Sequence, residues 1–426
     1  MSRNASRAMR PVVKQFAAAL LGAALLLAAN LIPLATSAAA DKPPEKPRVS
    51  AEASKTLKAA QDALEKQDYP TALTHLKETE ALPNKTAYDD FTLNQMYLFY
   101  YSRTNDMADA EKVLEALVAS PYLDKADVPV RLRTLAQLNY QNKDYDKAIQ
   151  FGERAIQEGN TNDDVFTLVD QAYYLKGDFP GALKSINAHM DVATKAGQVP
   201  SESLLKLALS TCLKLNDADC TTHALDRRIA AYPTPDNWRE LLYTINQTPG
   251  QSDPYLMQVY RLAFDLDILK GPEDYMEMAT LANDQGSPGE AQRVLEAGKQ
   301  KNVFGTAALK THSAQLLESV KNKVTTDQAS LPKIAADAQA AKTGTKDVAL
   351  GLAYFSYQQY DKAAEALTAG LAKGGLRNEA DARLILGIAQ LHAGKKDDAQ
   401  KTFDLVKGDP KLERLAHLWQ IRARQA

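Results

Sequence analysis

Two cysteines are the side chains in this sequence best suited to covalent chemistry. Cys212 and Cys220 are the only cysteines of the chain, and they flank the residues "LNDAD" in the stretch "TCLKLNDADC". This stretch has the pattern of a turn between two helices, so a disulfide here would join two antiparallel helices. An even number of cysteines in an oxidising compartment favours such a bond. The alternative is a pair of buried free thiols that pack as small apolar side chains, and the sequence leaves both open.

The histidines do not have the spacing of a metal site. None of the six forms His-x-x-x-His or His-Glu-x-x-His, the spacings that place two ligands on one face of a helix. We therefore expect surface or packed imidazoles, no metal site and no cofactor. The six are His75, His189, His223, His312, His392 and His417.

Other short motifs give no support for catalysis. The stretch "GDFPGALKS" looks superficially like a phosphate loop, but Lys184 comes three residues after Gly181 instead of directly after it. The acids in "FDLDIL" are two residues apart and would point to different faces of a helix. We expect no enzymatic activity, although catalytic groups could still converge from distant segments.

The elements that would position these residues are repeated along the chain. The stretch "NKDYDKAIQFG" around Ala148 returns as "YQQYDKAAEAL" around Ala363, and related stretches surround six further positions. Most successive copies are 34 to 39 residues apart, and the two longer gaps, 70 and 72 residues, are each about two such steps. Each long gap therefore contains one degenerate unit. The six further positions are Ala72, Ala110, Ala182, Thr221, Ala291 and Ala399.

Each copy has the same physical pattern. An apolar helix such as "RLRTLAQLNY" is followed by a short turn with Gly, Asn or Asp. A second helix then carries apolar residues at helical spacing, for example Ala148, Phe151 and Ala155. The recurrent small residue is expected where the two helices cross closely. The sequence thus predicts an all-α fold of helix-turn-helix units.

These units resemble tetratricopeptide repeats. The resemblance rests on the unit length, on "DYDKA" at the turn, and on the Leu-small pairs Leu135-Ala136 and Leu350-Gly351 in the first helix. It implies a right-handed superhelical solenoid of about 8 to 10 units, degenerate in the middle, whose concave face is lined by first helices and binds protein.

Composition changes along the chain predict its organisation. We expect a signal peptide over 1–40, a linker over 41–50, an N-terminal repeat array over 51–230 and degenerate repeats over 231–311. A connecting helical segment over 312–346 and a C-terminal repeat pair with a capping helix over 347–426 complete the prediction. In that last helix, the stripe of Leu412, Leu415 and Trp419 would cover the open end of the stack.

The first forty residues have the pattern of an export signal. Four basic residues and no acid precede the apolar run "FAAALLGAALLLAANLIPLA", and small residues follow at Ala38-Ala39-Ala40. We expect cleavage and a periplasmic location, and the alternative is an uncleaved inner-membrane anchor. The whole chain has 51 Lys plus Arg against 53 Asp plus Glu, a balance that argues against a nucleic-acid surface.

A candidate groove follows from the helix phase of three successive first helices. Amide, aromatic and Arg side chains there are expected to point away from the second helices, and such groups can hold an extended peptide. The alternative is that they fill a tight superhelix. In the C-terminal pair the same positions are apolar, for example Phe355, Leu384 and Ile388, so that face is expected to be covered. The groove residues are Gln95, Phe99, Arg103, Arg133, Gln137, Tyr140, Gln171 and Tyr174.

Together these features predict a non-enzymatic periplasmic scaffold or adaptor that binds a protein or peptide of the cell envelope. The run from "MYLFYYSRTND" to "KDYDKAI" also resembles exported repeat proteins encoded beside TonB-type systems. That resemblance implies TonB, ExbB or ExbD components, or an outer-membrane receptor, as partners. The alternatives are a glycan or small-ligand binder or glycan-acting enzyme, and an assembly chaperone for envelope or secretion components.

Overall fold

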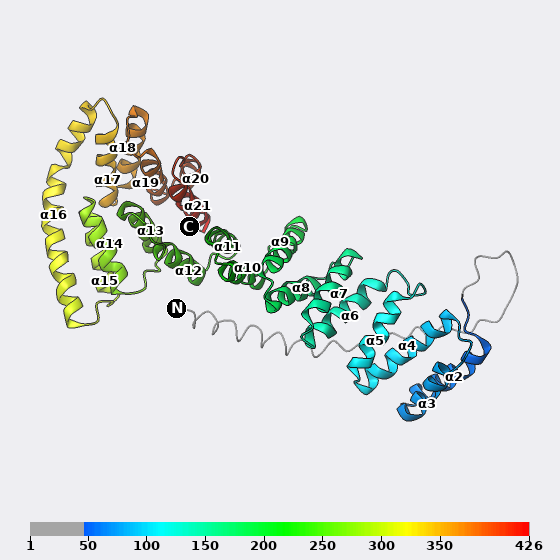
Figure 1. The fold of residues 1–426 in the computed structure, drawn as a ribbon. Helices are drawn as coiled ribbons and strands as arrows, with labels where there is room; N and C mark the ends of the chain where they lie inside the picture. The colour runs from blue at the N-terminus through cyan, green and yellow to red at the C-terminus, as the bar shows by residue number, and fades with distance from the viewer. Residues whose placement is uncertain (1–46, 426) are drawn as a thin grey trace. The chain divides into compact units, whose positions relative to one another are not determined.

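The computed structural model describes residues 47–425, which form twenty α-helices, α2 to α21, without a strand in that range. The chain divides into two compact units, unit 1 up to Val192 and unit 2 from Ala193 onward. The predicted signal peptide and residues 41–46 of the predicted linker lie outside the described residues. The predicted all-α fold is confirmed (Figure 1).

Unit 1 consists of four successive helical hairpins. Each pairs a first helix with a second helix across a short turn. The pairs are α2 (Ala51–Glu65) with α3 (Tyr69–Glu80), α4 (Ala87–Thr104) with α5 (Met107–Ala119), α6 (Val128–Gln141) with α7 (Tyr145–Gln157), and α8 (Asp163–Lys176) with α9 (Phe179–Lys195), which runs across the division.

Unit 2 continues with hairpins and adds two unpaired helices, the long α16 (Ala307–Ala340) and the last helix α21 (Pro410–Gln425). The pairs are α10 (Glu202–Leu215) with α11 (Ala218–Ala231), α12 (Pro235–Asn246) with α13 (Asp253–Asp265), α14 (Pro272–Asp284) with α15 (Pro288–Gln300), α17 (Thr345–Ser356) with α18 (Tyr360–Lys373), and α19 (Glu379–His392) with α20 (Lys396–Asp404).

The recurrent aspartate of the repeat is the N-cap of the second helix. Asp68, Asp106 and Asp144 each accept a hydrogen bond from the backbone N–H three residues later, which satisfies one of the free donors of the first helical turn. The residue before each aspartate has a φ of 59° to 63° and reverses the chain. One short sequence therefore encodes both the end of one helix and the start of the next.

The recurrent small residue lies at the closest approach of the two helices. Ala148 and Ala363 are fully buried. Glycine has the same role between α7 and α8 and between α17 and α18: a Cβ on Gly152 would lie 2.4 Å from Val169 Cγ2, and one on Gly351 would lie 2.6 Å from Leu367 Cγ. The helices cross too closely there for a larger side chain.

Replacing Ala148 or Ala363 with leucine should therefore destabilise the protein by about 1–3 kcal/mol, because the added atoms overpack a closed crossing. Ala108, which is exposed on α5, is the matched control and should tolerate leucine. Urea unfolding followed by circular dichroism measures the difference. Unchanged midpoints for both buried variants would contradict the assigned crossing.

The last helix packs against parts of unit 2 that are far away in the sequence. Leu412, Leu415 and Trp419 are buried, but α21 contacts α11 and α13 as well as α19 and α20. Arg414 forms a two-pronged ion pair with Asp226 of α11, with the shortest N–O distance 2.8 Å. The helix expected to cover an open end thus joins the end of unit 2 to its beginning.

The apolar face of the C-terminal repeats is covered from within the same unit. Phe355 is 3% exposed, with the guanidinium of Arg261 from α13 lying 5.3 Å from its ring centre. Leu384 and Ile388 of α19 are fully buried, and α21 packs on that helix. Helices α13 and α21 therefore cover the apolar face of the C-terminal repeats, as the sequence predicted.

Candidate protein-binding surface

The first helices of unit 1 lie on its inner side. Helix α2 contacts α4 and α6 contacts α8. Within the described part of unit 1, successive second helices (α3, α5, α7 and α9) make no comparable contact. Between like helices, the first helices therefore approach each other directly in two of the three successive steps, so their outward side chains are expected to face the concave surface of the stack.

Five of the predicted groove residues lie on α6 and α8, and three of them take part in links between the two helices. The Tyr140 hydroxyl donates to Oε1 of Gln171 at 2.9 Å, and Arg133 pairs with Asp164 of α8. Burial raises the pKa of Tyr140 to about 12, so its hydroxyl stays protonated and a donor. Gln137 of α6 is half-buried.

The residues on α4 form a separate group. Gln95 and Arg103 are exposed, and the Arg103 guanidinium lies 5.0 Å from the ring centre of Phe99, one turn earlier. Phe99 also packs on the apolar cluster of Ala63, Leu64 and Ala72 from the preceding hairpin. No contact between these α4 residues and the α6 set is found among the described residues.

Two aromatic residues that the sequence analysis did not single out support this surface. Tyr145 lies edge-on to Tyr140 at 5.9 Å between ring centres, and Phe179 lies edge-on to Tyr174 at 5.5 Å. Each pair joins the end of a first helix to the start of the second across the turn. The signal was present in the sequence, because the aromatic residue directly follows the N-cap aspartate.

Phe99 and Tyr140 contribute to the packing between hairpins as well as to the candidate groove. Tyr140 packs on the cluster of Ala148, Ile149 and Ala172. The helix phase places both side chains toward the groove, but their rings are long enough to reach the neighbouring hairpin. Replacing them would test stability and binding at once, so the exposed Arg103 is the sharper probe.

A buried histidine network lies beside this surface. His189 of α9 is 3% exposed and contacts Asp170 and Asp163 of α8, both at 2.8 Å. The Ser185 hydroxyl donates to Asp170 at 2.5 Å and not to the imidazole. A nucleophilic serine would need the histidine as its base, so this group of side chains joins two helices and is not a catalytic triad.

The ionisation of His189 should make unit 1 less stable as the pH rises. Burial alone would lower its pKa, but hydrogen bonds to Asp170 and Asp163 outweigh that and raise the pKa above 6.5. Burial also raises the pKa of Asp170. A group whose pKa is higher in the folded than in the unfolded protein stabilises the fold at pH values below its unfolded-state pKa. This stabilisation is lost as the pH rises through the folded-state pKa.

NMR titration of imidazole-labelled protein checks this directly, with His189→Gln identifying the resonance. We expect His189 to titrate above 6.5, and the melting temperature of the wild type to fall more between pH 6 and pH 9 than that of His189→Gln. A midpoint at or below the ordinary histidine value would mean that burial dominates.

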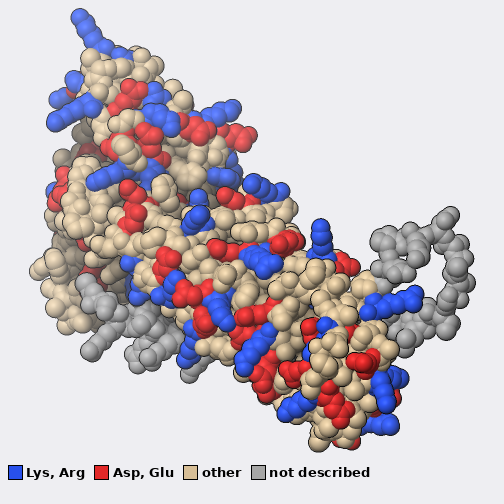
Figure 2. All heavy atoms as spheres, turned by 45° about the vertical axis from the view of Figure 1, so that its right-hand side comes forward, with Lys and Arg blue, Asp and Glu red and all other residues tan. Residues whose placement is uncertain are grey.

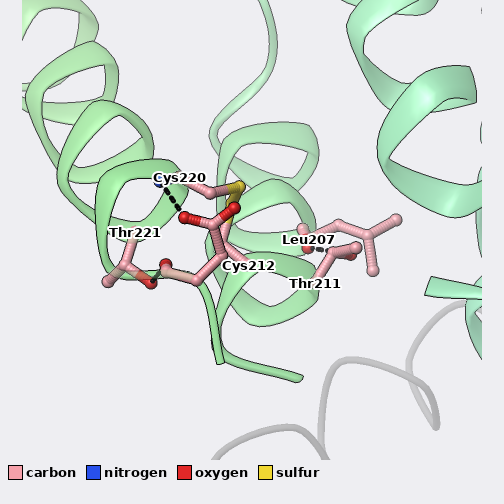
Figure 3. The surroundings of a disulfide bond; sticks show 6 residues. Leu207, Thr211, Cys212, Cys220 and Thr221 are labelled. Atoms are coloured by element: carbon pink, nitrogen blue, oxygen red, sulfur yellow. Dashed lines mark hydrogen bonds between the residues drawn. A yellow bond between two sulfur atoms is a disulfide. The ribbon is translucent and has the colours of Figure 1, made fainter. Parts of the chain in front are cut away.

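In unit 2, Cys212 and Cys220 are joined by a disulfide across the turn between α10 and α11, with Cα atoms 5.4 Å apart (Figure 3). The Cys220 backbone N–H donates to Oδ1 of Asp217 at 2.9 Å, so the bond lies at the capped start of α11. Cys212 is 2% exposed.

Reduction of this bond should lower the stability of unit 2 by about 2–3 kcal/mol, the chain-entropy value for a loop of about nine residues. Thiol labelling of unfolded, unreduced protein should modify no cysteine, and the urea midpoint should fall after reduction. Labelling of both cysteines before reduction would show that the thiols are free.

The surface charge is mixed, and ionisable clusters do not point to a metal site. Basic and acidic side chains alternate over the face shown in Figure 2. Within residues 47–425, no three His, Cys, Asp or Glu side chains are arranged to hold a metal ion. None of the described helices combines the length and apolar character needed to cross a membrane.

The fold and this surface define a class of protein: an all-helical repeat protein with a polar and aromatic face on its first helices. Residues 100–163 and 348–412 match the family profile described as Tetratricopeptide repeat. The match confirms tetratricopeptide repeats in both segments. The first segment lies in unit 1 and the second in unit 2. No curated protein matches the chain in sequence.

Several solved structures are similar to the chain at low identity. PilW, a widely conserved type IV pilus biogenesis factor, is 12% identical over 45% of this chain and 82% of its own, with a TM-score of 0.27. A tetratricopeptide repeat protein from Parabacteroides merdae is 11% identical over 77% and 98%, with a TM-score of 0.27. The TPR2AB domain of yeast Sti1, in a complex with a pHSP90 chain, is 12% identical over 70% and 96%, with a TM-score of 0.24. With TM-scores below 0.5, these likenesses do not identify a function for this chain.

Proposed function

We propose that this chain is a non-enzymatic scaffold that binds an extended protein segment along the first helices of unit 1. The observation that carries the proposal is the inner face of the first helices, where amide, aromatic and Arg side chains form one group on α6 and α8 and a separate group on α4. Tetratricopeptide repeats generally mediate contacts between proteins, and this face has the residue types that dominate binding energy in such contacts.

Arg103 is the residue most suited to recognise a partner. It is exposed and stacked on Phe99, and it makes no ion pair with another described residue. Arg133, in contrast, is already paired with Asp164. A partner carboxylate could bind Arg103 by a charge-assisted hydrogen bond without breaking an internal contact. Gln95, about two turns away on the same helix, can pair with the peptide backbone.

The proposed compartment is the cell envelope. The signal-like pattern of the first forty residues supports export, and the joined pair Cys212 and Cys220 suits an oxidising compartment. The resemblance to exported repeat proteins beside TonB-type systems makes the periplasmic parts of TonB, ExbB or ExbD, or an outer-membrane receptor, the first partners to test.

A charge reversal distinguishes the two faces of unit 1. Arg103→Glu changes the inner face, and Arg154→Glu makes the same change on the second helix α7, where Arg154 is exposed. In pull-downs from envelope extract and with purified periplasmic TonB, ExbB and ExbD domains, Arg103→Glu should weaken capture at least about tenfold. Arg154→Glu should capture the same proteins as the wild type.

Circular dichroism of each variant separates loss of binding from loss of fold. If Arg103→Glu keeps its helicity and still captures every wild-type partner, the first helices of unit 1 are not the binding face. If both variants lose capture equally, binding depends on net charge and not on this surface.

A further inference from the structure

The helices of unit 2 line a partly open cavity of about 320 Å³. Side chains from α13, α14, α15, α17, α18, α19 and α21 line it, so helices that are far apart in the sequence meet around it. Its volume is at the lower end of the range of ligand pockets, about 300–1,000 Å³. All of its lining residues belong to unit 2.

Most of the lining is apolar or aromatic. Phe264 of α13, Phe355 of α17 and Ile388 of α19 contribute to it. Tyr360 stacks on His392 with ring centres 4.8 Å apart, and His392 lies edge-on to Trp419 at 6.4 Å. Such walls favour a ligand with an apolar or aromatic body.

The acids that line the cavity are already neutralised. Glu290 is held by Arg261 through three contacts of 2.8 to 3.2 Å. Asp265 accepts a hydrogen bond from Arg422 at 2.7 Å and lies 3.4 Å from His392 Nε2.

Arg293 carries the positive charge that remains. Its nearest acid oxygen, on Glu290, is 3.8 Å away, and that carboxylate is already bonded to Arg261. Burial lowers the pKa of His392, which favours its neutral form. Burial also raises the pKa of Asp381, which lies outside the lining and accepts a hydrogen bond from Gln258. The lining itself holds two arginines and two acids, but Asp265 is also paired with Arg422 from outside the lining. One cation, Arg293, is therefore left without a carboxylate of its own.

Two hydrogen-bond donors of the lining have no acceptor. The Nη1 of Arg293 and the Nε1 of Trp419 are buried and meet no partner among the described residues. Trp419 is fully buried. A buried donor without an acceptor costs about 1–3 kcal/mol, and a charged donor costs more, so two of them at one cavity point to an acceptor that binds there.

We propose that this cavity binds a small organic carboxylate with an apolar or aromatic body. The Arg293 guanidinium and the Trp419 indole N–H donate to the carboxylate oxygens, and the body packs on Phe264, Phe355 and Tyr360. The ligand would join α13, α15 and α21, so its binding should also stabilise the closed arrangement of unit 2.

The chain contains two tryptophans, Trp238 and Trp419, so Trp238→Phe leaves the cavity residue as the only indole. We would titrate that protein with 3-phenylpropionate, with the uncharged 3-phenylpropionamide, and with inorganic phosphate. The carboxylate should change the Trp419 emission saturably, with a Kd below about 20 mM, and raise the melting temperature. The amide and phosphate should each bind at least tenfold more weakly.

Substitutions then locate the binding. In the same Trp238→Phe background, Arg293→Gln should weaken 3-phenylpropionate at least about tenfold, as expected for loss of a charge-assisted hydrogen bond. Arg239→Gln, on the exposed face of α12, is the matched control and should not change the Kd. Trp419→Phe keeps an aromatic ring and removes the donor, so the rise in melting temperature on binding should shrink.

Three results would overturn the proposal. The first is no saturable change with 3-phenylpropionate, and the second is equal binding of the amide or of phosphate. The third is an unchanged Kd in Arg293→Gln. If Arg293→Gln does not fold, the comparison of 3-phenylpropionate with its amide and the Trp419→Phe variant still test whether the carboxylate binds in this cavity.

Discussion

Replacing Glu290 with alanine should destabilise unit 2 by about 3–5 kcal/mol, the largest effect expected of a single side chain here. Glu290 is 1% exposed and Arg261 is 6% exposed, and three hydrogen bonds join them. Removing the carboxylate leaves a buried guanidinium without its counter-charge. The aromatic ring of Phe355, 5.3 Å away, compensates only in part.

Glu296→Ala is the matched control on the same helix, because its side chain is 40% exposed and pairs with Lys321 at 3.6 Å. An exposed pair of this kind contributes about 0–1 kcal/mol. Both tryptophans lie in unit 2, so urea unfolding followed by their emission reports on this unit. Arg261→Met with Glu290→Met should recover much of the loss, since a buried ion pair can often be replaced by apolar residues. Equal midpoints for Glu290→Ala and Glu296→Ala would show that the pair is not buried as described.

The local parts of the fold could be predicted from the sequence because they depend on neighbouring residues. Asp144 caps α7 and Ala148 lies at the crossing, four residues apart in one turn of helix. The spacing of such pairs was enough to predict helix-turn-helix units and their close crossing. The confirmed tetratricopeptide repeats at 100–163 and 348–412 contain two of these turns.

The long-range parts could not be predicted in this way. Arg414 meets Asp226 across 188 residues of sequence, and no periodicity encodes which distant helix a last helix will contact. For the same reason the cavity, which needs α13 and α21 together, has no signal in the sequence. Within the candidate groove, the residue types and their helical phase were enough to propose which side chains face the groove. Whether a long side chain such as Tyr140 reaches a neighbouring hairpin depends on the exact spacing of helices.

A close contact between two backbones in unit 2 predicts the second large effect. Gly344 starts α17, and its N–H donates to the Gly374 carbonyl at 2.9 Å. A Cβ on Gly344 would lie 1.8 Å from the carbonyl oxygen of Gly370 and 2.5 Å from its carbon. These are backbone atoms, so no side-chain rotation relieves the contact, and α17 must move away from α18.

Gly344→Ala should therefore cost about 3 kcal/mol or more, at or beyond the upper end of the usual overpacking range. The φ of Gly344 is −73°, which alanine adopts freely, so the cost is steric and not conformational. Gly305→Ala is the matched control, because a Cβ there meets no atom within 4 Å. It should leave stability nearly unchanged or slightly higher, since alanine lowers the entropy of the unfolded chain. Tryptophan-monitored urea unfolding compares the two, and similar midpoints would mean that α17 and α18 are farther apart than the structure places them.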